Sequence, residues 1–110
     1  MLENTEGNII SQIYPLGENV ILSEQRAQEL IPLLRALTNK VRQKITMLNS
    51  QKQHYSKMSS EYQNLEEMIN KEFDLWCDHV QRLGAFPLSF GKCKIQLPRK
   101  SFLWEYQEVK

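Results

Sequence analysis

The chain has 110 residues, of which 41% are hydrophobic and 25% charged, and its formal net charge at pH 7 is +1. These values are typical of one folded domain and exclude a chain that is disordered throughout. No apolar run approaches the roughly 20 residues that cross a bilayer, and the first residues lack the basic and apolar regions of a secretory signal, so we expect a cytoplasmic protein without membrane contact.

Residues 1–20 form an N-terminal segment that we expect to be partly disordered. Within it, residues 8–14 suit either a strand or a short helix, and Pro15 and Gly17 end that stretch. The remaining residues, 21–110, are predicted to form a single helical-hairpin domain.

A first helix is predicted over residues 23–52, with Ser23 as its N-cap and the negative charge of Glu24 in its first turn. Its apolar residues recur every three or four positions, which is helical spacing. They are Ala27, Leu30, Leu34, Leu37, Val41, Ile45 and Leu48. Pro32 cannot donate a backbone hydrogen bond to the carbonyl of Gln28, so we expect either a kink there or a helix that starts near Leu30.

Polar residues 49–56 interrupt the apolar pattern and predict the turn between two helices. A second helix is predicted over residues 56–83, with Gly84 as its C-cap. Its stripe consists of Met58, Tyr62, Leu65, Ile69, Phe73, Trp76, Val80 and Leu83. Two helices of similar length joined by a short turn predict an antiparallel pair.

The charges of the two predicted helices are opposite. Residues 23–52 contain six basic and two acidic side chains, whereas residues 56–83 contain three basic and six acidic ones. Opposite charges along the flanks favour pairing of the two helices with one another.

The C-terminal segment changes to alternating apolar and polar residues, which predicts a β-hairpin over residues 92–107 with a four-residue loop at residues 98–101. One face of this hairpin is apolar and should pack on the helices or on a partner. The predicted cross-strand pairs are Leu97 with Phe102, Ile95 with Trp104, Cys93 with Tyr106, and Lys94 with Glu105.

Together these elements define a mainly α protein, a long antiparallel helical hairpin with a small C-terminal β-hairpin. The two apolar stripes are wider than a single helix–helix contact covers, so another layer must bury them. A second copy of the chain would supply that layer by completing a four-helix bundle. The residues expected in this core and self-association surface are Leu34, Leu37, Val41, Ile45, Leu65, Ile69, Phe73 and Trp76.

Three segments resemble a family of short bacterial proteins known as domain of unknown function 2203. Residues 21–35 (ILSEQRAQELIPLLR) are similar to its opening, residues 80–87 (VQRLGAFP) to the segment after its second helix, and residues 102–108 (FLWEYQE) to its closing motif. The resemblance implies a bacterial helical hairpin with a terminal β element, and it brings no activity. Leu103, Glu105 and Gln107 depart from the cysteine, arginine and proline that the family often has there.

Neither an enzyme nor a cofactor or metal site is expected. Cys77 and His79 project about 200° apart on the second helix, and neither the cysteines nor the histidines have the spacing of metal ligands. Cys77 and Cys93 are too few for a disulfide scaffold and are expected to be small apolar residues in a reducing compartment.

Two functions follow from these patterns. The first is a structural or protein-interaction module that self-associates through its helices as a homodimer, with a protein partner that the sequence does not identify. The alternative is nucleic-acid binding through the basic C-terminal hairpin, with Trp104 or Tyr106 available for stacking. The basic residues of that alternative site are Lys92, Lys94, Arg99 and Lys100.

Overall fold

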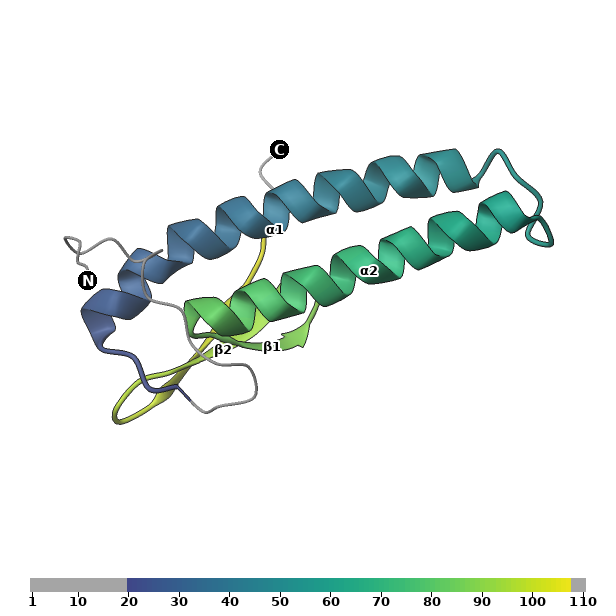
Figure 1. Cartoon of the computed structure of the whole chain (residues 1–110). Helices are drawn as coiled ribbons and strands as arrows, with labels where there is room; N and C mark the ends of the chain where they lie inside the picture. The colour runs from purple at the N-terminus through teal and green to yellow at the C-terminus, as the bar shows by residue number, and fades with distance from the viewer. Residues whose placement is uncertain (1–19, 108–110) are drawn as a thin grey trace, which may run out of the picture.

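The computed structural model describes residues 20–107 and shows two long helices lying over a small sheet (Figure 1). The elements in chain order are α1 (Glu24–Lys52), α2 (Ser60–Leu83), β1 (Phe86–Ser89), β2 (Lys92–Gln96) and β3 (Ser101–Glu105). The predicted mainly α class is confirmed. The expectations for residues 1–19 lie outside the described residues.

Helix α1 begins as its first residues predict. Ser23 has extended backbone angles, φ −69° and ψ 162°, and its hydroxyl oxygen accepts a hydrogen bond of 3.1 Å from the backbone N–H of Arg26. This bond satisfies one of the free N–H groups at the helix start. The helix then runs through Pro32, so the alternative of a helix starting near Leu30 is wrong.

Helix α2 begins at Ser60, four residues later than predicted, and Ser59 is its N-cap. The Ser59 hydroxyl accepts from the backbone N–H of Tyr62 at 3.1 Å, and it donates to the Ser56 carbonyl at 2.6 Å. At the other end, Gly84 is the C-cap as predicted, with φ 106°, a left-handed conformation that favours glycine.

The two helices lie side by side and run in opposite directions (Figure 1). Their facing flanks are joined by ion pairs from basic α1 to acidic α2: Lys44 Nζ lies 2.9 Å from Glu72 Oε2, and Lys52 Nζ lies 3.5 Å from Glu66 Oε2. Exposed pairs of this kind contribute little individually. Their sign nevertheless matches the charge difference between the two helices.

The C-terminal part is a three-stranded antiparallel sheet in the order β1-β2-β3, so the predicted two-stranded hairpin is wrong. The additional strand, β1, was missed because it has four residues and contains Pro87. Proline lacks the N–H that a central strand needs, and β1 accommodates it because it is an edge strand. Gly91, with φ 80°, lies in the turn that leads from β1 into β2.

The register between β2 and β3 differs from the predicted one by two residues. Cys93 pairs with Trp104, Ile95 with Phe102, and Lys94 with Leu103, in place of the predicted pairs. The cause is a tighter turn between β2 and β3. The Leu97 N–H donates to the Lys100 carbonyl at 2.8 Å, so the loop contains two residues, 98 and 99, instead of the predicted four. A shift of two residues keeps each side chain on its predicted face.

The main core lies between the helix pair and the sheet. Trp76 is fully buried, and its indole N–H donates to the hydroxyl of Thr38 across the helix pair at 2.9 Å. The Phe90 ring, from the turn after β1, lies 5.0 Å from the Trp76 ring and 5.2 Å from the Phe73 ring. The helices and the sheet therefore meet around one tryptophan.

We predict that Thr38→Val lowers the free energy of unfolding by about 1–3 kcal/mol, because the buried indole N–H of Trp76 loses its acceptor while the side-chain shape is kept. Urea unfolding followed by circular dichroism measures the change. Thr46→Val, on the exposed surface of the same helix, is the matched control and should change stability by less than about 0.5 kcal/mol. Equal effects of the two substitutions would show that the bond contributes nothing.

Candidate interaction surfaces

The eight residues predicted for the core and self-association surface lie in or beside the core of the single chain. Five of them are buried: Leu34, Val41, Ile45, Ile69 and Trp76. The other three, Leu37, Leu65 and Phe73, are half-buried and pack against that core. The buried five cannot touch a second copy unless the chain opens, so any contact between copies must use neighbouring residues.

One such surface lies on the side of the helix pair that faces away from the sheet. On α1, Asn39 marks the sheet side, because its side-chain oxygen accepts a hydrogen bond from the Tyr106 hydroxyl at 2.8 Å. Leu37 precedes Asn39 by two positions and so projects about 200° away from it. We call this side the sheet-distal face.

Helix α2 contributes to the sheet-distal face in the same way. The Phe90 ring marks its sheet side by contacting Phe73 and Trp76. Leu75 is 54% exposed, and Met68, seven positions earlier and therefore on the same side of the helix, is 48% exposed. The ion pair between Lys44 and Glu72 bridges the two helices on this side. The residues that define the face are Leu33, Leu37 and Lys44 of α1 and Met68, Glu72 and Leu75 of α2.

A second surface lies on the sheet, on the side away from the helices, and we call it the outer sheet face. Strand β2 turns Cys93 and Ile95, both fully buried, toward the core, so its alternate residues face outward. Lys94 has Phe86 as its register partner on one side and Leu103 on the other. These two apolar side chains are 49% and 58% exposed. A cation therefore lies between two exposed apolar groups.

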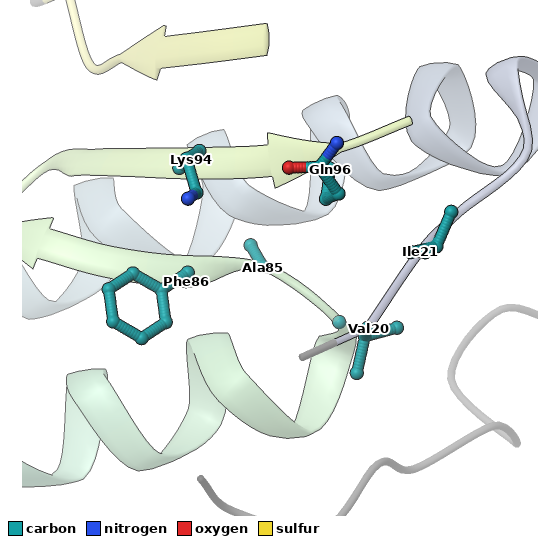
Figure 2. Close-up of a pocket in the computed structure, with 7 residues that line it drawn as sticks. Val20, Ile21, Ala85, Phe86, Lys94 and Gln96 are labelled. Carbon is teal, nitrogen blue, oxygen red and sulfur yellow. The ribbon is translucent and has the colours of Figure 1, made fainter. Parts of the chain in front are cut away.

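The Lys94 ammonium lies over the aromatic ring of Phe86, 5.8 Å from its centroid. Beside this pair the surface sinks into a hollow of about 310 Å³, which lies between the start of β1 and the chain entering α1 (Figure 2). The residues around it are Val20, Ile21, Gly84, Ala85, Phe86, Lys94 and Gln96.

The chain entering α1 is attached to the sheet next to this hollow. The Leu22 N–H donates to the Gln96 carbonyl at 2.8 Å, and Ile21 forms a parallel bridge with Gln96. The hollow thus lies where β2 changes neighbour from β1 to residues 20–22. No pattern in the sequence indicated this contact, because it joins segments about 75 positions apart.

The structure separates the residues proposed for nucleic-acid binding. Trp104 is buried, so its ring is not available for stacking, and Tyr106 is half-buried with its hydroxyl bonded to Asn39. The cause is the alternation of β3, which turns Trp104 toward the core. Phe86 is an exposed aromatic side chain next to Lys94. The alternation of Phe86 and Leu88 about Pro87 was the sequence signal for this strand.

The four predicted basic residues lie at two places along the sheet. Lys92 and Lys94 are on β2, on the outer sheet face, and Lys92 is opposite Glu105 of β3. Arg99 and Lys100 are exposed in and beside the turn between β2 and β3. Glu105 offsets part of the charge of the first pair.

Both cysteines are free thiols, Cys77 half-buried and Cys93 buried. Burial raises the pKa of the Cys77 thiol, with smaller contributions from Asp74 and Asp78. Burial likewise raises the pKa of Cys93 to about 12, with a smaller contribution from Cys77. Thiols with raised pKa values are poor nucleophiles near neutral pH.

Within residues 20–107, no group of three or more His, Cys, Asp or Glu side chains is placed to hold a metal ion. In the same part of the chain, no helix combines the length and the apolar character needed to span a bilayer.

Comparisons with protein-family models, with curated proteins and with solved structures found no match to this chain.

We predict that the folded protein reacts at Cys77 but not at Cys93 when treated with a disulfide reagent at pH 8. Cys93 is buried, and burial raises the pKa of its thiol to about 12, whereas Cys77 is partly accessible. The Cys77→Ser variant should therefore release no coloured thiolate until denaturant is added, while Cys93→Ala should still release one equivalent, slowly. Fast release of two equivalents from the native chain would contradict this assignment.

Proposed function

We propose that this protein is a non-enzymatic interaction module that self-associates, and that two copies pack through their sheet-distal faces. In this arrangement the antiparallel helices of each copy form half of a four-helix bundle. The observation that carries the proposal is the exposure of Leu75 and Met68 beside the half-buried Leu37, on a side of the helix pair that the sheet leaves uncovered.

The charges of the helices favour a second copy as the occupant of this face. A two-fold axis parallel to the helices would place α1 of one copy antiparallel to α2 of the other. Basic α1 would then lie against acidic α2 across the interface, as it does within each chain through Lys44 and Glu72. The alternative axis, perpendicular to the helices, would place like-charged helices together.

The non-enzymatic, cytoplasmic role belongs to the same proposal. Burial of the two thiols, which raises both of their pKa values, argues against a cysteine nucleophile. We also propose membership of the family known as domain of unknown function 2203, on the order of the three segments that resemble it.

Light scattering at micromolar concentration tests the proposal, and we expect the mass of a dimer. Leu75→Glu should yield monomers, weakening association at least about tenfold, because it places a charge in the apolar centre of the interface. Leu103→Glu is the matched control, since Leu103 is a similarly exposed leucine on the outer sheet face, and it should remain dimeric.

Two results would contradict the sheet-distal interface. If the wild-type chain is monomeric and melts cooperatively, self-association is ruled out. If Leu103→Glu gives monomers while Leu75→Glu remains dimeric, the interface lies on the outer sheet face and not on the sheet-distal face. Circular dichroism of each variant confirms that the fold is retained.

A further inference from the structure

We propose that the outer sheet face is a binding site for single-stranded nucleic acid, with one base against Phe86 and the sugar-phosphate chain along the lysines of β2. This surface is separate from the sheet-distal face, so the inference does not depend on self-association. It rests on three features of the outer sheet face: an exposed ring, a paired donor and acceptor beside it, and cations that continue along the strand.

The exposed ring is that of Phe86. Half of this residue is accessible, and the hollow of about 310 Å³ opens beside it. The Lys94 ammonium lies over the ring, 5.8 Å from its centroid, so a base that stacks on Phe86 displaces this ammonium toward the edge of the base. The aliphatic side chains of Val20 and Ile21 form the opposite wall (Figure 2). Stacking of this kind needs a base that is not paired within a duplex.

The paired donor and acceptor are Lys94 and Gln96. The amide nitrogen of Gln96 donates to the carbonyls of Leu97 and Lys100, at 2.9 and 3.2 Å, so the turn fixes the orientation of this amide. Its oxygen is then directed along β2 toward Lys94 (Figure 2). An ammonium donor and an amide acceptor at the rim of one hollow match the acceptors and donors on the edge of a base.

The cations continue away from the hollow in both directions along β2. Lys92 is two positions before Lys94, on the same side of the strand and about 7 Å away. Arg99 and Lys100 lie at the opposite end, in and beside the turn after β2. Glu105 of β3 is the cross-strand partner of Lys92, and its negative charge lowers the positive electrostatic potential there. A row of cations longer than one nucleotide favours a strand over a free mononucleotide.

The test is fluorescence anisotropy of the full chain with a labelled 12-nucleotide single strand, as DNA and as RNA, at about 50 mM salt. Binding by the wild type is expected for at least one of the two strands. Phe86→Ala should weaken it about tenfold through lost stacking. Lys94→Gln should also weaken it, because the edge of the base loses its ammonium donor.

The controls are matched substitutions at the far end of the molecule, in the connection between α1 and α2 (Figure 1). Met58→Ala and Lys57→Gln remove an exposed apolar group and an exposed charge there, and both should bind as the wild type does. Circular dichroism melts establish that Phe86→Ala and Lys94→Gln are folded.

Several outcomes would overturn the site. These are no binding of either strand at 50 mM salt, equal binding by folded Phe86→Ala, or tighter binding of a duplex than of the single strand. Displacement of the strand by an equimolar mononucleotide would show that the hollow takes a free nucleotide, which also overturns the proposal.

Discussion

The burial of Trp76 is the constraint on which the rest of the structure depends. Its indole is fully buried, and its N–H donates to Thr38 of the other helix, because leaving a buried donor unpaired costs about 1–3 kcal/mol. That contact fixes one point at which α1 and α2 are aligned. The Phe90 ring then packs on the same indole, which places the turn after β1, and with it the sheet, against the helix pair.

Covering this core on one side leaves the molecule with two different exposed surfaces. The sheet buries the side of the helices that carries Trp76, while the sheet-distal face keeps Leu75 and Met68 accessible. The strand alternation that buries Cys93 and Ile95 necessarily turns Lys92 and Lys94 outward, next to Phe86. Both candidate surfaces are therefore consequences of how the single core is closed.

Much of the helical part could be predicted because its signals are local. Ser23 and Gly84 act as caps through bonds to neighbours a few positions away, and the apolar stripes repeat with the period of the helix itself. The errors lie where local signals compete. Ser59 is the N-cap of α2, although Ser56 is also a serine and lies three positions earlier. Strand β1 was not predicted because it contains Pro87, and proline is uncommon in strands that are not at the edge of a sheet.

The sequence by itself determined both ends of α1, the C-terminal end of α2, the opposite charges of the helices, and which side of β2 is apolar, because each depends on residues close together in the chain. The tertiary structure alone decided which apolar residues stay exposed, since burial depends on what packs against them from afar. Thus Trp104 is in the core whereas Phe86 is at the surface. Likewise, Gln96 forms a β-bridge with Ile21, which lies about 75 positions earlier in the chain. Periodicity identifies an apolar face, but only the packed chain shows whether that face is already covered.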